Sequence, residues 1–133
     1  MPAGAAAAKA GAAALLLGAC QPLAMSPPPE RLPRHEGVET RLIDDDIVNL
    51  IVRMSGPATE GDLIAYSRCA AAQYAVIRGY GFARHVRTNV KVEGSVRVAD
   101  AVYTVSPTLP RGLQTIDAEV TVADCAELGI PTV

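Results

Sequence analysis

The sequence is poor in aromatic and metal-binding side chains. It has no Trp, one Phe (Phe82) and four Tyr, so stacking platforms for bases or sugars are scarce. Its two His residues, His35 and His85, are too few for a histidine metal site, and the spacing of the three Cys residues fits no zinc pattern. We therefore expect no metal centre and no cofactor.

A basic excess and a long apolar run are also missing. The formal net charge is −2 at pH 7, whereas nucleic-acid-binding domains normally carry a basic excess, so we expect no nucleic-acid partner. No apolar run reaches the roughly 18 to 20 residues that a transmembrane helix needs. The glycines of Gly79-Tyr80-Gly81 resemble part of a phosphate loop, but they follow a predicted helix instead of preceding one. No catalytic cluster is evident, and we expect a protein without enzymatic activity.

The N-terminal region carries the pattern of a lipoprotein signal. The segment Leu15-Leu16-Leu17-Gly18-Ala19-Cys20 joins a short apolar run to two small residues and a cysteine, as in the cleavage and lipid-attachment site of bacterial lipoproteins. We predict that residues 1–19 are a signal peptide and that Cys20 is acylated. Gln21, in place of Asp, favours the outer membrane over the inner one. An ordinary signal peptide, or an Ala-rich tract with a chance Cys, is the alternative.

Residues 20–45 form a proline-rich segment. Five of the ten prolines lie here, at positions 22, 27, 28, 29 and 33. Such a segment buries too little apolar surface to offset the entropy of ordering, so we predict a disordered tether. Residues 46–133 then form one small α/β domain that faces the periplasm, because the remaining length suits a single modest core.

The folded domain is expected to begin with a strand at 47–55, where apolar and polar residues alternate. A helix follows, with Thr59 as its N-cap and Asp62 in the capping-box position. Gly79 and Gly81 end this helix, because both tolerate the left-handed conformation of a C-cap.

Three more strands are predicted by alternation, over 82–93, 96–105 and 114–123. Within 96–105 the apolar residues change from even-numbered to odd-numbered positions. A bulge near Ala99-Asp100 would place them all on one face of the strand. The expected fold class is α+β. We predict a two-layer β-α-β-β-β arrangement, with one helix packed on a mainly antiparallel four-stranded sheet whose other face lies in water.

Two parts of the C-terminal half resemble small uncharacterised lipoproteins of alphaproteobacteria. They are Arg78-Gly79-Tyr80-Gly81-Phe82-Ala83-Arg84-His85 and the stretch from Thr115-Ile116-Asp117-Ala118-Glu119 to Asp124-Cys125-Ala126. The resemblance covers most of the chain from about Cys69 onward. It implies neither an activity nor a catalytic residue.

A cationic surface is the most suggestive feature of the domain. Strand parity and the predicted hairpin place four side chains on one wet face: His85, Arg87, Lys91 and Arg97. Such a patch would contact an anionic envelope component or an acidic partner. The alternative is an ordinary solvated face, on which Asp117 and Glu119 of the last strand balance the positive charges.

Two cysteines, Cys69 and Cys125, remain once Cys20 is lipidated. The compartment is oxidising, the count is even, and a domain of this size gains stability from a cross-link. Cys69 lies in the middle of the helix and Cys125 just after the last predicted strand, where the tail could turn back over the helix. We predict a Cys69–Cys125 disulfide; two separately buried thiols are the alternative.

Two functions remain open. The first is a structural or interaction lipoprotein of the bacterial cell envelope, held at the membrane by its lipid anchor and contacting an envelope protein or an anionic envelope component. The second is a small-ligand-binding lipoprotein or lipoprotein enzyme, which requires a concave pocket. A pocket lined by Tyr80, Arg84 and His85 would favour the second function, and a flat charged sheet would favour the first.

Overall fold

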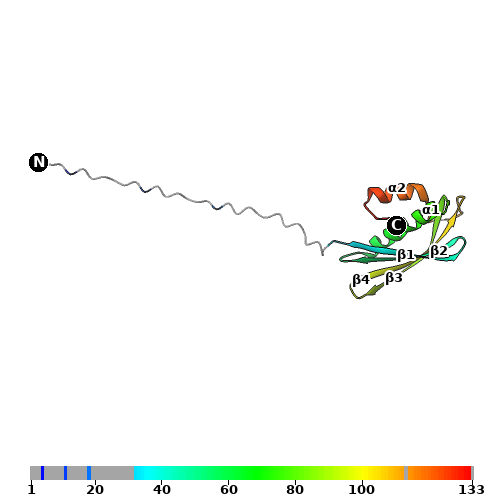
Figure 1. Ribbon diagram of the computed structural model, residues 1–133, viewed down its shortest axis with the longest axis horizontal. Helices are drawn as coiled ribbons and strands as arrows, with labels where there is room; N and C mark the ends of the chain where they lie inside the picture. The colour runs from blue at the N-terminus through cyan, green and yellow to red at the C-terminus, as the bar shows by residue number, and fades with distance from the viewer. Residues whose placement is uncertain (1–3, 5–10, 12–17, 19–31, 113, 133) are drawn as a thin grey trace.

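A computed structural model describes residues 4, 11, 18, 32–112 and 114–132. Its elements follow one another as β1 (Arg34–Asp44), β2 (Ile47–Ser55), α1 (Glu60–Ile77), β3 (Phe82–Glu93), β4 (Val96–Ser106), β5 (Thr115–Asp117) and α2 (Ala118–Glu127). The strands form one antiparallel sheet with the order β1-β2-β4-β3-β5. Figure 1 shows both helices on the same side of this sheet, with α2 beyond α1. The α+β class is confirmed, with one strand and one helix more than predicted.

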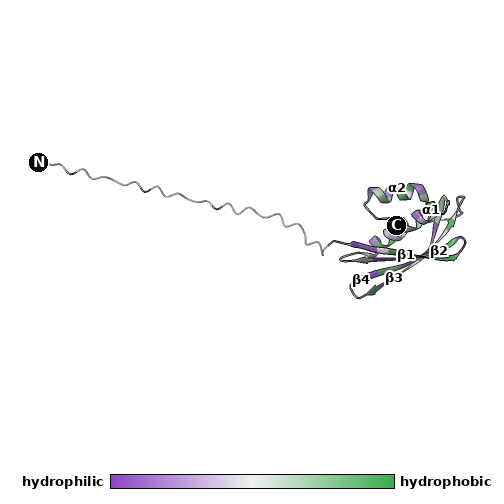
Figure 2. Cartoon of the chain, viewed as in Figure 1, coloured by the Kyte–Doolittle hydropathy of each residue, from purple (hydrophilic) through white to green (hydrophobic). Residues whose placement is uncertain are grey.

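The core lies between α1 and the central strands. β2 and β4 contribute alternate, almost fully buried residues to it: Val48, Leu50, Val52, Met54, Ala99, Ala101, Tyr103 and Val105. From the helix, Leu63 and Tyr66 pack against them, together with several alanines whose small side chains let α1 approach the sheet closely. Figure 2 shows hydrophobic positions along the strands and on both helices.

The helix α1 begins and ends at the predicted signals. The Thr59 hydroxyl accepts a hydrogen bond from the Asp62 backbone N–H at 3.2 Å, and the Thr59 N–H donates to the Asp62 carboxylate at 2.8 Å. These two bonds form the capping box. At the other end Gly79 has a φ of 81°, and the Tyr80 N–H reaches the Ala75 carbonyl at 2.8 Å, which closes the helix.

The prediction of a disordered tether is wrong for its C-terminal part, which forms the first strand. The sequence predicts disorder throughout residues 20–45, but Arg34–Asp44 is an edge strand paired along β2. Its start is fixed to α1, because the His35 ring contacts the Tyr66 ring edge-on with the centroids 4.6 Å apart. Register shifts occur at Glu36 and Ile43, and they interrupt the alternation that would otherwise reveal a strand. Residues 20–31 lie outside the described part of the chain.

The last predicted strand is mostly a helix. Only Thr115–Asp117 is extended, and α2 begins at Ala118. The Asp117 carboxylate caps it by accepting from the Val120 N–H at 3.1 Å. Its buried residues, Ala118, Thr121 and Cys125, are spaced three and four apart, as one face of a helix requires.

The predicted bulge lies in β3, not in β4. The register between β3 and β4 shifts between His85 and Arg87, so Val86 is the extra residue, whereas β4 pairs with β2 without interruption. The parity change in β4 has another cause. Val98 and Val102 are buried on the face away from α1, so this central strand carries apolar residues on both faces and the far face is not simply wet.

Candidate functional site

A cleft of about 540 Å³ opens between α1, β3, β4 and the segment that leads into β5. From α1 it is lined by Glu60, Ile64 and Arg68, which lie four residues apart and therefore share one helix face. The sheet side and the entry to β5 contribute the remaining lining residues: His85, Thr88, Tyr103, Gln114, Thr115 and Ile116.

The β3 bulge brings His85 to this cleft. His85 is the last residue of β3 before the register shift. It pairs with Tyr103, whose side chain belongs to the core beneath α1. Paired residues of antiparallel strands share a face, so the imidazole lies on the α1 side. The rings of His85 and Tyr103 meet edge-on with their centroids 5.3 Å apart.

Both ring nitrogens of His85 have partners. Nδ1 lies 3.0 Å from the Gln114 Oε1, and Nε2 lies 2.7 Å from the Thr88 hydroxyl. Because an amide oxygen only accepts, Nδ1 donates to Gln114, and the Thr88 hydroxyl is the hydrogen-bond partner of Nε2. The imidazole is thus held in one orientation, and neither nitrogen is left open toward the cleft.

Tyr103 forms the floor of the cleft. Its side chain is 3% exposed, and burial raises the pKa of its phenol to about 12, against a smaller opposing effect of Arg68. A phenol in this position stays protonated at any physiological pH. It therefore contributes a neutral wall to the cleft.

Two arginines flank His85. Arg68 lines the main cleft, and Arg84 lines an adjoining hollow of about 450 Å³ that shares His85 and Gln114 with it. The Arg84 guanidinium also lies against the backbone of Gly112. Among the described residues, neither Arg68 nor Arg84 forms an ion pair. Arg84 pairs with Thr104, whose side chain lies on the face away from α1, so the main cleft offers one unpaired cation, Arg68, and the adjoining hollow offers the other.

The structure does not bring the four predicted cationic residues together. Arg87 and Lys91 lie on the face away from α1, where they pair with Asp100 at 3.3 Å and Glu93 at 2.8 Å. His85 lies on the α1 side, and Arg97 shares that side because it pairs with Met54 of the core. No common cationic patch results.

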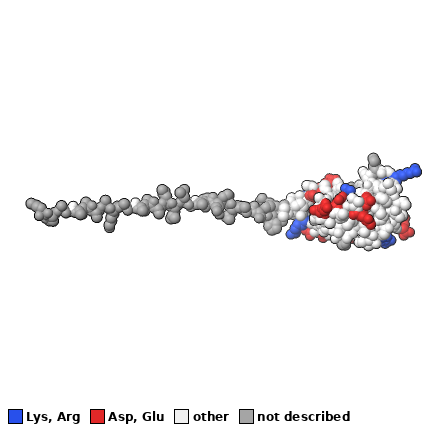
Figure 3. Space-filling view, turned by 90° about the horizontal axis from the view of Figure 1, so that it is seen from above, with Lys and Arg blue, Asp and Glu red and all other residues white. Residues whose placement is uncertain are grey.

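The two acidic residues expected to balance that patch also lie elsewhere. Asp117 caps α2 and Glu119 stands in its first turn. Figure 3, seen from above the helices, shows acidic side chains gathered on that face. Within the described part of the chain, no group of three or more His, Cys, Asp or Glu residues is arranged to hold a metal ion.

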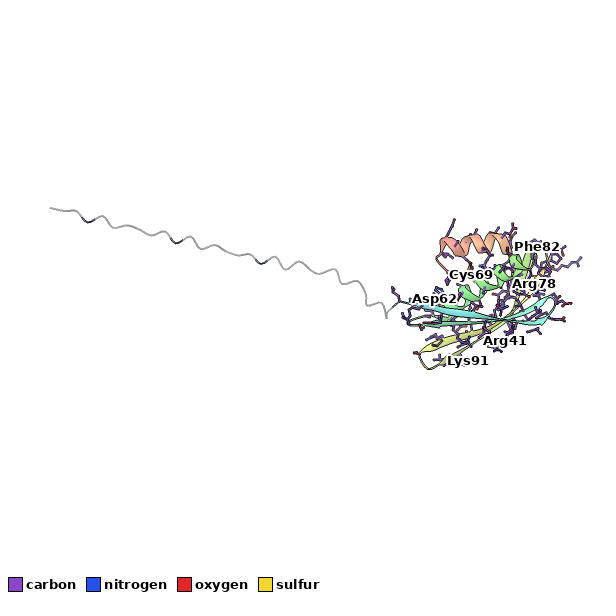
Figure 4. The ribbon with its side chains drawn as sticks, in the orientation of Figure 1. Arg41, Asp62, Cys69, Arg78, Phe82 and Lys91 are labelled. Atoms are coloured by element: carbon purple, nitrogen blue, oxygen red, sulfur yellow. A yellow bond between two sulfur atoms is a disulfide. The ribbon has the colours of Figure 1, made fainter. Side chains whose placement is uncertain are left out.

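The predicted cysteine pair is at bonding distance. The Sγ atoms of Cys69 and Cys125 are 2.04 Å apart, and Figure 4 shows Cys69 on α1 below α2. Cys20, the predicted lipid-attachment residue, lies outside the described residues. Neither helix in the described part has the length and hydropathy needed to cross a membrane.

Sequence reasoning missed Arg68, Thr88 and Gln114 as site residues. Arg68 carried a usable signal, since it lies one turn after Ile64 on the exposed side of a predicted helix. Gln114 carried none, because it reaches His85 only through a loop in which its own φ is 66°. Of the residues named for the alternative pocket, Arg84 and His85 line a hollow and Tyr80 does not.

Comparisons with known proteins place the chain in a family. It is 31% identical over 87 residues to the "Uncharacterized 26.9 kDa protein in nqo8 5'region" of Paracoccus denitrificans, a match that covers 65% of this chain. The chain spans only 34% of that relative's length. No solved structure is significantly similar to this chain. Residues 35–129 match the YNQ4 C-terminal domain, from β1 to the end of α2, and the chain therefore belongs to the YNQ4 C-terminal domain family.

Proposed function

We propose that this domain binds a small ligand with an acidic group and an apolar body in the cleft around His85. One observation carries the proposal: the cleft combines an unpaired arginine, Arg68, with apolar walls, and an adjoining hollow that shares His85 and Gln114 holds a second unpaired arginine, Arg84. Ligand sites are typically concave and mostly apolar, with a few polar groups that fix orientation. The small-ligand alternative therefore becomes the leading function.

The charges select an acid. A guanidinium forms two parallel hydrogen bonds with a carboxylate or a phosphate, which favours an acidic group at Arg68 or Arg84. Glu60 also lines the cleft, but it is two helical turns from Arg68, about 12 Å along the axis. Its repulsion of an anion at Arg68 is screened over such a distance. Ile64, Ile116 and the Tyr103 ring supply the surface for the apolar body.

Binding suits the geometry of His85 better than catalysis. A general base must have a nitrogen within reach of the proton that it removes. Both nitrogens of His85 already contact Gln114 and Thr88, so the ring acts as a fixed wall with its edges satisfied. We retain the expectation that the domain is not an enzyme as part of this proposal.

We further propose that the domain is held at the bacterial envelope by a lipid on Cys20, facing the periplasm and at the outer membrane. The apolar run ending in Leu17-Gly18-Ala19-Cys20 supports this location. The Cys69–Cys125 pair supports it too, because disulfides persist in oxidising compartments. An interaction module for an anionic envelope component is the weaker candidate, since Arg87 and Lys91 already have acidic partners.

Calorimetric titration of the full-length chain carrying Cys20→Ser tests the ligand class. Octanoate and octyl phosphate present a carboxylate and a phosphate on the same tail, and octanamide is the neutral control. We expect at least one acid to bind and octanamide to bind much more weakly. Arg68→Gln should weaken acid binding about tenfold, through loss of a charge-assisted hydrogen bond.

Arg78→Gln is the matched control, because Arg78 is the C-cap residue of the same helix and lies over the Tyr74 ring, outside the cleft. It should leave the affinity for the acids unchanged. Equal binding of octanamide and octanoate, or equal loss of affinity in both arginine variants, would contradict the proposal.

A further inference from the structure

Among the described residues, nothing pairs with the outer edge of β1. β1 is the first strand of the sheet, so within this part of the chain only its β2 side is paired, and α1 packs mainly on β2, β4 and β3. The residues from Glu39 to Asp44 are all exposed, and the Leu42 side chain is 52% exposed. A long open edge with exposed apolar residues is a template for another strand.

The regular part of this edge is short and well bounded. Between the register shifts at Glu36 and Ile43, the stretch from Gly37 to Leu42 pairs with β2 residue by residue. Val38, Thr40 and Leu42 lie opposite buried residues of β2 and so face α1, whereas Glu39 and Arg41 face the other way. Figure 4 shows Arg41 on the side of the sheet away from the helices.

Symmetry restricts how two such edges can pair. Antiparallel strands of two identical chains are related by a two-fold axis perpendicular to the sheet, and a closed dimer uses the same patch twice. Paired residues must share a face of the sheet, so the central pair on the axis must consist of two copies of the same residue. If Glu39 or Arg41 were the central residue, it would lie opposite its own copy, and two like charges in a cross-strand pair are destabilising.

We propose that two copies of the chain pair through β1 in antiparallel register centred on Thr40. In this register Glu39 of each copy lies opposite Arg41 of the other, on the face away from the helices, and Val38 lies opposite Leu42 on the helix side. Two opposite-charge pairs and two apolar pairs form at once. The exposed Leu42 side chain is covered in the process.

Charged side chains on an edge strand commonly block pairing. Here Glu39 and Arg41 already attract each other within one copy, with the Arg41 Nε donating to the Glu39 Oε1 at 2.8 Å, and Arg53 lies 3.7 Å from the same carboxylate. The same two charges, placed two residues apart about Thr40, become complementary to a second copy. The order of the negative and positive charges along β1 thus favours pairing with the β1 edge of a second copy.

Cysteine cross-linking of the full-length chain in its membrane tests this register. Thr40→Cys places two thiols opposite each other at the axis, where cross-strand Cβ atoms are roughly 5 Å apart. We expect a disulfide-linked dimer on non-reducing gels after mild oxidation. Glu119→Cys, on exposed α2, and the parent chain are controls that should give little dimer.

Charge reversal separates the proposed register from chance collision. In the Thr40→Cys background, Glu39→Arg or Arg41→Glu alone turns both opposite-charge pairs into like-charge pairs, and cross-linking should fall about tenfold. The double variant Glu39→Arg with Arg41→Glu restores both pairs and should restore the dimer. A yield equal to that of Glu119→Cys, no effect of the single reversals, or no rescue by the double reversal in folded protein would overturn the proposal.

Discussion

The Sγ atoms of Cys69 and Cys125 lie at bonding distance and link the middle of α1 to α2. α2 packs chiefly on α1 and has few contacts with the sheet, of which those to β5 are the main ones. The cysteine pair is therefore the chief covalent constraint on α2 among the described residues. It also lines a hollow between the two helices that shares Ile64 and Arg68 with the main cleft.

Replacing both cysteines should destabilise the domain. Cys69 and Cys125 are 56 residues apart, and opening a loop of that length costs about 4 kcal/mol in the chain-entropy model. We expect Cys69→Ala with Cys125→Ala to lower the free energy of unfolding in urea by about this amount. Reductant should destabilise the parent chain similarly and leave the double variant unchanged. A parent chain that is insensitive to reductant and has two alkylatable thiols would mean that no bond forms.

The capping box of α1 predicts a defined loss of stability. Thr59→Ala removes the hydroxyl that accepts from the Asp62 N–H, and loss of an N-cap costs about 1 kcal/mol. Thr108→Ala is a matched exposed control outside the helix, and its hydroxyl forms none of the observed hydrogen bonds. Equal unfolding free energies for Thr59→Ala and the parent chain would show that the cap contributes nothing.

The same box predicts an acid dependence. The hydrogen bond from the Thr59 backbone, and then that of its side chain, lower the pKa of Asp62 below its usual 3.8. A lowered pKa stabilises the fold above the unfolded value, and this stabilisation disappears as pH falls through the folded value. We expect the stability difference between the parent chain and Asp62→Asn to shrink below about pH 4. A difference that stays constant from neutral pH to below pH 4 would contradict the role of the Asp62 carboxylate.

Tyr103 predicts a loss of stability at alkaline pH. Burial raises the pKa of Tyr103 to about 12 in the folded state, from the usual 10.0 of a tyrosine. A raised pKa means that the stabilisation is complete below pH 10 and is lost as pH rises toward 12, at most about 2 to 3 kcal/mol. Tyr103→Phe should lose less stability than the parent chain over this range. Identical alkaline unfolding curves would contradict the assignment.

Lipidation at Cys20 predicts a change of location. Cys20→Ala removes the thiol that takes the lipid, so the chain should remain as uncleaved precursor or appear as a product without the acyl mass. Membrane fractionation with mass spectrometry measures both. An unchanged mass and an unchanged membrane fraction would contradict the proposed anchor.

Local signals made part of the fold predictable. Thr59 and Asp62 determine the start of α1, and Gly79 its end, because capping depends on residues within one turn of each other. The cysteine pairing was predictable as well, since few cysteines leave few choices.

Other elements depend on contacts that alternation does not report. Residues 116–122 alternate between apolar and polar side chains like a strand, but Asp117 caps a helix there and Cys125 is linked to α1. β1 follows a proline-rich segment, and its own pattern is broken at Glu36 and Ile43. One extra residue, Val86, moved His85 from the predicted wet face into the cleft, so the site was misplaced for the same reason.

Amide chemical-shift mapping with octanoate examines the proposed ligand cleft residue by residue. Added stepwise to the isotope-labelled full-length chain carrying Cys20→Ser, octanoate should shift the signals of Arg68, His85 and Thr88 most strongly. These shifts should saturate along one binding curve and disappear in Arg68→Gln. Small shifts that never saturate, or the largest shifts at Leu109 on the exposed loop outside the cleft, would show that octanoate does not bind in the cleft.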